Sequence, residues 1–180
     1  MVKLETKLKI KKIKIGILGG TFDPAHKGHL AISKEALKKF KLKSVIWAIT
    51  DQNPFKEKTA NDLKKRITIC KKVIATNKSI KVKFYEDIIN SNKTADLINY
   101  LSKNKRYDLF FLMGADNLIN FHKWHKWRQI LKKSNVIVFD RNGYKKKSLN
   151  SKTYKSLNKE LITFIEFNKV NISSSKLKKI

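Results

Sequence analysis

The chain has 180 residues, of which 41% are hydrophobic, and it carries a formal net charge of +28. This length and apolar content suit one globular domain with a single core, and they argue against a multidomain protein. Cys70 is the only cysteine, which excludes an internal disulfide and a multi-cysteine metal site and fits a reducing compartment. We interpret Cys70 as a core residue.

The positive charge raises the hypothesis of binding to nucleic acid or to anionic membranes, because a basic field attracts polyanions. Lysine supplies most of this charge, spread from Lys3 to Lys179, and arginine occurs only as Arg66, Arg106, Arg128 and Arg141. Such dispersal favours compositional drift over a selected basic face. We therefore expect no specific nucleic-acid partner.

Residues 1–12 are predicted to form a basic N-terminal extension. They lack the continuous apolar segment of a secretion signal, and no later stretch approaches membrane-spanning length. We expect a soluble, cytoplasmic protein without a membrane partner.

Short apolar runs rich in branched and aromatic residues alternate with helical patterns along residues 13–180. The predicted strands are Ile13–Leu18, Val45–Ile49, Ile80–Phe84, Leu109–Met113, Val136–Phe139 and Leu161–Ile165. Helical spacing occurs over Leu30–Phe40, Leu63–Ile74 and Ala95–Leu101, with Asn61 or Asp62 as a cap and Asn77 as a stop for the second helix. This order predicts one α/β domain with a doubly wound, Rossmann-like, mainly parallel sheet, whose ligands bind beyond the carboxyl ends of the strands. The polar segment Arg141–Ser156 shows no clear periodicity and is predicted to be a loop.

The segment after the first strand has the composition of a phosphate-binding loop. It reads Gly19-Gly20-Thr21-Phe22-Asp23-Pro24-Ala25-His26-Lys27-Gly28-His29 and leads into the first predicted helix. Paired glycines allow backbone N–H groups to approach an anion, and a helix N-terminus attracts negative charge. His26 and His29 are three residues apart, so they share one face of that helix end. The alternatives are two histidines that only pack, or part of a metal site without its other ligands.

This segment resembles the signature of the nucleotidyltransferase superfamily with the histidine-x-glycine-histidine motif. The double glycine, Pro24 and His26 resemble the nicotinate-nucleotide adenylyltransferase family more than the pantetheine-phosphate adenylyltransferases or the cytidylyltransferases. The resemblance implies that His26, His29 and the N–H groups near Thr21 and Phe22 bind the reacting phosphates of ATP.

Two further segments resemble the same family. Asn53-Pro54-Phe55-Lys56 is similar to its Asn-Pro-x-Lys loop, which implies that Lys56 faces phosphates, although a turn with a surface lysine would look alike. Lys93-Thr94-Ala95-Asp96 resembles its Tyr-Thr-x-Asp segment, which implies that Thr94 lies near the nicotinate nucleotide. The other interpretation of Thr94 is a helix cap.

The fourth strand is followed by two more matches. Gly114-Ala115-Asp116-Asn117 resembles the family's Gly-x-Asp loop, which implies that Gly114 and Asp116 contact ATP, with a helix cap as the alternative for Asp116. Trp124 resembles the tryptophan that stacks on the nicotinate ring. We interpret Trp127 as a core residue, and His122 and His125 as part of a solvated helix end rather than metal ligands.

The last match is Ile172-Ser173-Ser174-Ser175-Lys176-Leu177-Lys178, which resembles Ile-Ser-Ser-Thr-x-Ile-Arg and implies that Ser173, Ser174, Ser175 and Lys178 bind the β and γ phosphates. Lysine in place of arginine exchanges a bidentate fork for a point charge. The resemblance also implies that the domain is shortened, since the chain ends at Ile180.

The resemblance as a whole implies transfer of an adenylyl group from ATP to nicotinate mononucleotide, with Mg²⁺ as cofactor and no metal site formed by the protein. His26, His29, Lys56 and Lys178 would be the catalytic residues. The alternatives are another nucleotidyltransferase of the same superfamily, of the pantetheine-phosphate adenylyltransferase or cytidylyltransferase type, and a non-catalytic, basic RNA-binding protein on the same scaffold.

Overall fold

The computed structural model describes residues 11–53, 58–141, 143–156 and 161–166. Its centre is a six-stranded sheet in which every pairing is parallel. The strands are β1 (Ile13–Gly20), β2 (Ser44–Ile49), β3 (Ile80–Phe84), β4 (Tyr107–Gly114), β5 (Asn135–Phe139) and β6 (Ile162–Ile165). The six predicted strands are thus confirmed, and so is the predicted Rossmann-like class.

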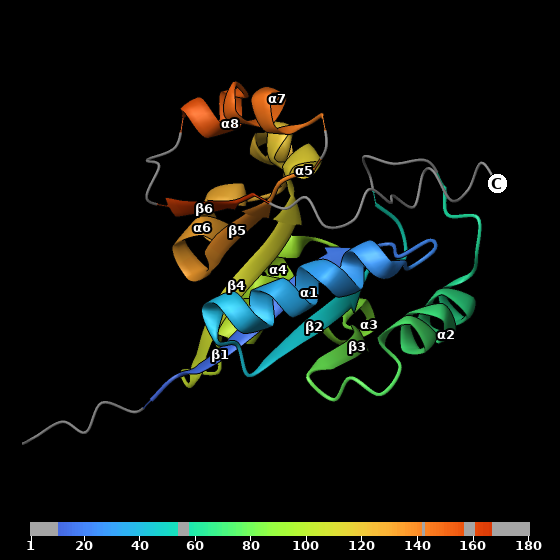
Figure 1. Ribbon diagram of the computed structural model, residues 1–180. Helices are drawn as coiled ribbons and strands as arrows, with labels where there is room; N and C mark the ends of the chain where they lie inside the picture. Colours follow the sequence, from blue (N-terminus) through green and yellow to red (C-terminus); the bar gives the residue numbers. More distant parts are fainter. Residues whose placement is uncertain (1–10, 54–57, 142, 157–160, 167–180) are drawn as a thin grey trace, which may run out of the picture.

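The helices connect successive strands of this sheet (Figure 1). The longer ones are α1 (Lys27–Phe40), α2 (Leu63–Ile74), α4 (Thr94–Ser102) and α6 (Trp127–Lys133). The shorter ones are α3 (Glu86–Ile89), α5 (Ala115–Ile119), the 3₁₀ turn η1 (Phe121–Lys123), α7 (Lys145–Leu149) and α8 (Lys152–Lys155). The loop predicted for Arg141–Ser156 is therefore wrong, because α7 and α8 occupy most of that segment.

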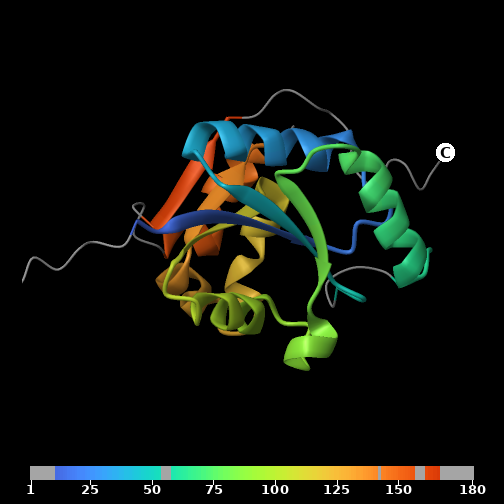
Figure 2. The same ribbon diagram turned by 90° about the horizontal axis from the view of Figure 1, so that it is seen from below.

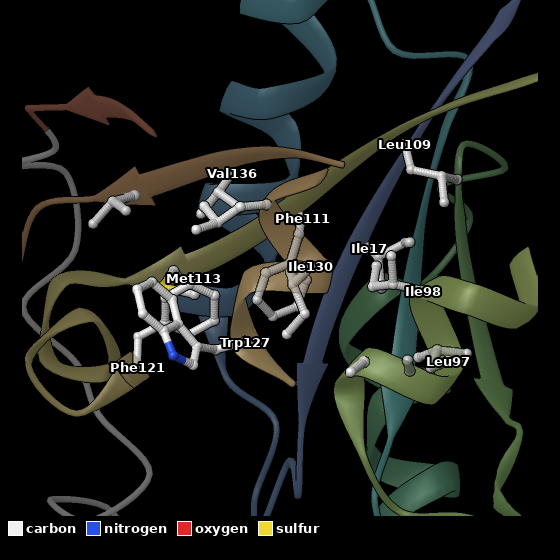
Figure 3. Packing of buried hydrophobic residues seen from close by; sticks show 14 of the residues in the cluster. Ile17, Leu97, Ile98, Leu109, Phe111, Met113, Phe121, Trp127, Ile130 and Val136 are labelled. Carbon is white, nitrogen blue, oxygen red and sulfur yellow. The ribbon is translucent and has the colours of Figure 1, made fainter. Parts of the chain in front are cut away.

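The sheet is covered on both faces, which explains why its inner strands β2, β4 and β5 are largely apolar, whereas the outer strand β3 alternates apolar residues with Lys81 and Lys83. Figure 2 shows α1 and α2 on one face and α4 on the other. Alternate residues of β1 serve the two sides, since Ile17 packs with the α4 and α6 residues and Leu18 packs with the α1 and α2 residues. Figure 3 shows the first of these cores, which includes Ile17 of β1, Phe111 of β4 and Ile130 of α6.

Two core predictions are confirmed. Trp127 is buried on α6. Cys70 is also buried, and this burial raises the pKa of its thiol to about 12, against a smaller opposing effect of Arg66. The thiol is therefore neutral and unreactive at physiological pH.

The strand order is β3-β2-β1-β4-β5-β6. The chain moves outward from β1 through β2 to β3, then returns to the other side of β1 to continue with β4. The topological switch point lies between β1 and β4, and open α/β sheets bind ligands outside the carboxyl ends of the strands at that point. Gly20 ends β1 and Gly114 ends β4, so both predicted glycine loops begin at this edge.

Candidate active site

The first turn of α1 is built around the two histidines. His26 is the N-cap residue, and its Nδ1 accepts a hydrogen bond from the backbone N–H of Gly28 at 3.1 Å. The backbone N–H of His26 in turn donates to Nδ1 of His29 at 3.2 Å. This is a capping box in which imidazoles replace the usual serine and glutamate.

The capping box determines the tautomer of both rings. Because each Nδ1 accepts a hydrogen bond, each neutral imidazole must carry its proton on Nε2. The rings stack on each other with centroids 3.9 Å apart, and both are half-buried. The sequence predicted that the two histidines share one helix end, and the structure confirms it.

Aromatic packing fixes the loop that precedes the helix. Phe22 has a left-handed backbone with φ of 49°, and its ring is 2% exposed. This ring stacks on the indole of Trp47 of β2, with ring centroids 5.0 Å apart, and its centroid lies 4.8 Å from that of the His29 ring. The Phe22 side chain is thus part of the core, which leaves the backbone of Thr21 and Phe22 as the groups that can serve phosphate.

Ser33 connects this aromatic packing to α1. Its hydroxyl donates to the carbonyl of His29 at 2.8 Å and accepts from the indole N–H of Trp47 at 2.8 Å. Ser33 is fully buried. The serine therefore ties the turn that carries His29 to the strand that holds Phe22.

Replacing Ser33 with alanine should lower the melting temperature by several degrees. The buried indole N–H of Trp47 would lose its partner, which costs roughly 1–3 kcal/mol. Ser134→Ala is the matched control, because Ser134 makes the same kind of bond to a carbonyl four residues back but accepts none from an indole. Equal losses of melting temperature in both variants would contradict this role of Ser33.

A second group of predicted residues lines a cavity of about 430 Å³ at the same edge of the sheet. Gly19, Gly20, Thr94 and Trp124 all border it. Lys93 is the N-cap residue of α4 and Thr94 is its first helical residue, so the cap interpretation of Thr94 is wrong. Trp124 is half-buried and makes edge-type ring contacts with Phe121 and Phe111. The ring centroids are 5.4 Å and 6.2 Å apart, respectively.

Polar and basic side chains complete the cavity wall, among them Asn53, Tyr85, Glu86, Lys93, Lys123 and His125. Burial, followed by the neighbouring Tyr100 and Tyr107, raises the pKa of Tyr85. Its phenol therefore remains a hydrogen-bond donor at neutral pH. Glu86 accepts the hydroxyl of Thr50 and the backbone N–H of Asp51, so its carboxylate braces the end of β2.

Asp116 lies beside this cavity but does not line it. It stands in the first turn of α5, where the N-cap is Gly114 without a side-chain cap, so the cap interpretation is wrong here too. Its carboxylate pairs with Arg141 at 2.6 Å, and the Arg141 guanidinium lies 5.7 Å from the centre of the Tyr144 ring. Its neighbour Asn117 does reach the cavity wall.

The two remaining histidines flank Trp124 closely in sequence, and His125 lines the cavity. Nδ1 of His122 lies 2.8 Å from the hydroxyl of Thr153 on α8, and His125 is exposed. Within the ranges given above, no group of three or more His, Cys, Asp or Glu residues could hold a metal ion.

Several predicted residues lie outside the described ranges. They are Lys56, Ser173, Ser174, Ser175 and Lys178, together with most of the basic extension. Across the residues that the structure describes, no helix has the length and apolar character needed to traverse a bilayer.

Sequence reasoning missed the residues that hold the site loops in place, most clearly Arg66. This arginine is fully buried on α2 and donates to the carbonyl oxygens of Thr21 and Thr50, which follow β1 and β2. A signal was present, because position 66 falls on the apolar face of the Leu63–Ile74 helix. An arginine there is rarely buried without a network of acceptors.

Comparison with known proteins places this geometry in a family. The Cytidylyltransferase-like family matches residues 17–180. A protein of Pelagibacter ubique, named "Probable nicotinate-nucleotide adenylyltransferase", is 64% identical over the full length of both chains. A protein of the same name from Bradyrhizobium sp. strain ORS 278 is 37% identical over 81% of this chain and 76% of its own.

Solved structures show the same fold. The Plasmodium falciparum nicotinic acid mononucleotide adenylyltransferase complexed with NaAD superposes with a TM-score of 0.72 at 18% identity, covering 93% of this chain and 83% of its own. A second structure of that protein, complexed with APC, gives the same TM-score and coverage at 17% identity. The full-length 64% match, the family match and the shared fold together show that this chain is a nucleotidyltransferase that belongs to the nicotinate-nucleotide adenylyltransferase family.

Proposed function

We propose that the protein transfers the adenylyl group of ATP to nicotinate mononucleotide, giving nicotinate adenine dinucleotide and pyrophosphate. The observation that carries this proposal is the pair of stacked imidazoles at the N-terminal end of α1, each with its Nδ1 facing a backbone N–H, at the same sheet edge as the cavity that Trp124 and Thr94 border. The family membership and the names of the relatives support it.

The chemistry requires alignment more than acid–base catalysis. The phosphate oxygen of the acceptor is already anionic at neutral pH, so it can attack the α-phosphorus of ATP directly. A bond forms between that oxygen and the α-phosphorus, and the bond from the α-phosphorus to the bridging oxygen breaks. The electron pair leaves with pyrophosphate, without a covalent enzyme intermediate.

In this proposal His26 and His29 stabilise charge on the reacting phosphates through their Nε2 protons, with the N–H groups near Thr21 and Phe22 beside them. Lys56 and Lys178 offset charge on the attacking and leaving groups, and Ser173, Ser174 and Ser175 hold the β and γ phosphates.

Mg²⁺ enters this proposal as part of the substrate complex with ATP. Magnesium sites of this kind use few protein carboxylates and rely on phosphate oxygens and water. The described residues fit that pattern, since they contain no three-ligand cluster and the Asp116 carboxylate already pairs with Arg141. The charge that Mg²⁺ supplies when bound would offset the negative charge that grows on pyrophosphate.

The cavity is suited to an anionic acceptor with a flat ring. The half-buried indole of Trp124, which lines the cavity and packs against Phe111 and Phe121, offers an aromatic surface to such a ring. Lys93 and Lys123 on the cavity wall add positive charge against the single carboxylate of Glu86. These features support an acceptor that combines phosphate with an electron-poor ring.

A pyrophosphate-release assay with ATP and a panel of acceptors tests the proposal. Nicotinate mononucleotide or its amide should be turned over, while phosphopantetheine and glycerol phosphate should be poor acceptors. Equal turnover with phosphopantetheine would contradict the acceptor assignment, and it would leave adenylyl transfer itself intact.

Replacing Gly114 with alanine tests the ATP side of the site. The added Cβ would collide with a carboxylate oxygen of Asp116, and that side chain can swing away without disturbing the backbone. Loss of one charge-assisted contact to ATP should raise the KM for ATP about tenfold and leave the KM for the acceptor unchanged.

Arg141→Ala provides the comparison for Gly114→Ala, because it releases the same carboxylate from the other side. If ATP binding depends on where the Asp116 carboxylate is held, the two variants should weaken ATP binding similarly. The double variant should then bind ATP little worse than either single variant. A change confined to the acceptor would contradict the assignment of Asp116 to ATP.

A further inference from the structure

Arg66 carries a positive charge into the core. Its described side-chain hydrogen bonds all go to the loop after β1, the loop after β2 and Asn61, which lies just before α2. Its guanidinium donates to the carbonyl of Thr21 at 2.9 Å, to the carbonyl of Thr50 at 2.8 Å and to the carbonyl of Asp51 at 3.1 Å. It also pairs with the Asp51 carboxylate at 2.9 Å, and its Nε donates to the carbonyl of Asn61 at 3.0 Å. The Arg66 side chain is 0% exposed.

These acceptors belong to two neighbouring loops at the site, the loop after β1 and the loop after β2. Thr21 follows Gly20 in the loop that leads to the two histidines, on the ATP side of the proposed reaction. Thr50 lines the cavity proposed for the acceptor, and its hydroxyl is bound by Glu86 on the same wall. One guanidinium therefore spans the loop after β1 and the loop after β2.

Asp23 adds a second connection of the same kind. Its buried carboxylate accepts the backbone N–H of Ala60 at 2.6 Å and the side-chain amide of Asn61 at 2.7 Å. Arg66 holds the carbonyl of that same Asn61. The loop after β1 is thus joined to the segment before α2 by two sets of hydrogen bonds that meet at Asn61.

Stability alone is a weak reason to keep this charge. Replacing a buried ion pair by apolar residues is often neutral or stabilising, and the Asp51 carboxylate that balances Arg66 is 65% exposed. A rigid planar fork offers something that an apolar residue cannot, because it fixes several carbonyl oxygens in defined directions at once.

We propose that Arg66 is a positioning residue that sets the distance between the ATP loop and the acceptor cavity. It touches neither substrate. It acts by holding the carbonyl oxygens of Thr21 and Thr50 on one guanidinium nitrogen, Nη1, so that the attacking oxygen meets the α-phosphorus at a single spacing. This inference rests on the proposed adenylyl transfer for its catalytic consequence, and only on the described contacts for its structural one.

Arg66→Lys tests the proposal, with Arg106→Lys as the matched control, since Arg106 is exposed before β4, at the opposite edge of the sheet. A lysine keeps the charge but loses the fork. We expect kcat to fall at least about tenfold while the Kd of each substrate alone changes less than about threefold, because misplacement by about 1 Å affects reaction more than binding. Arg106→Lys should match the unmodified protein in kcat and in both Kd values.

Hydrogen exchange gives a readout independent of turnover. Amides of residues 20–23 and 50–53 should exchange faster in Arg66→Lys, with peptides from β4 and β5 unchanged. Uniformly faster exchange, or a fall in kcat that only follows the unfolded fraction, would overturn the proposal. If the unmodified chain shows no turnover with nicotinate mononucleotide, the proposed function fails, and the exchange pattern still decides whether Arg66 positions the loops.

Asp51→Ala keeps the test decisive if Arg66→Lys does not fold, because the Asp51 side chain is largely exposed. This variant removes one acceptor of the Arg66 guanidinium, the Asp51 carboxylate, which lies in the loop after β2. Exchange should accelerate over residues 50–53 and not over 20–23, with a smaller fall in kcat. Unchanged exchange over residues 50–53 would overturn the proposal.

Discussion

Replacing His29 with alanine should lower kcat by about a hundredfold or more, the scale seen when one preorganised donor to developing charge is removed. The Nε2 proton of the ring is the group expected to meet the reacting phosphates, since Nδ1 is committed to the capping box. A single-turnover measurement at saturating ATP and acceptor isolates the chemical step from binding and product release.

The same substitution should also cost some stability, because it removes one half of the capping box and a ring contact to Phe22. A lost cap costs about 0.5–2 kcal/mol. His29→Gln separates the two effects, since glutamine is a natural third residue of a capping box and can accept the same backbone N–H. We expect His29→Gln to regain most of the melting temperature and little of the rate. Recovery of the rate in step with the melting temperature would show that His29 is structural.

Replacing Trp124 with alanine should raise the KM for the acceptor by about thirtyfold and leave the affinity for ATP nearly unchanged. The estimate combines roughly 1 kcal/mol of ring stacking with part of the burial of an aromatic side chain, and 1.4 kcal/mol corresponds to a factor of ten. Separate titrations of ATP and nicotinate mononucleotide into the variant measure each affinity directly.

Trp124→Phe is the control for this experiment, because it keeps a flat ring between Phe111 and Phe121. It should restore most of the acceptor affinity. The melting temperatures of both variants must accompany the titrations, since Trp124 also packs edge-on against those two rings. A loss confined to ATP would place the ring on the other side of the site.

The sheet was predictable because its inner strands β2, β4 and β5 are buried on both faces. Continuous branched and aromatic runs such as Val136–Phe139 indicate buried parallel strands when helices alternate with them. The short helices were not predictable in the same way. α3 has four residues, and α7 and α8 have five and four, too few to show a helical repeat, so the prediction of a loop over Arg141–Ser156 failed.

The candidate site likewise contains residues that the sequence could identify and residues that it could not. His26, His29, Thr94 and Trp124 were identified through local motifs, and the structure brings the first two together at one helix end and the last two around one cavity. Their catalytic and binding roles stay predictions. A residue that contacts distant backbone atoms leaves no local motif in the sequence. Arg66 is such a residue, since the carbonyls that it binds lie 45 and 16 positions away. Only its place on an apolar helix face hinted at burial.

The central place of β1 has a consequence for the newly made chain. β2 and β3 can add to one side of β1 as soon as they emerge from the ribosome, but β4, which covers the other side, begins only at Tyr107. At ordinary rates of synthesis the roughly ninety intervening residues take about 5–20 s. During that interval the inner edge of Ile13–Gly20 offers unpaired N–H and C=O groups, which are a template for association with other chains. The incomplete sheet of the nascent polypeptide therefore needs protection from association, and the folded enzyme, in which β4 covers this edge of β1, does not.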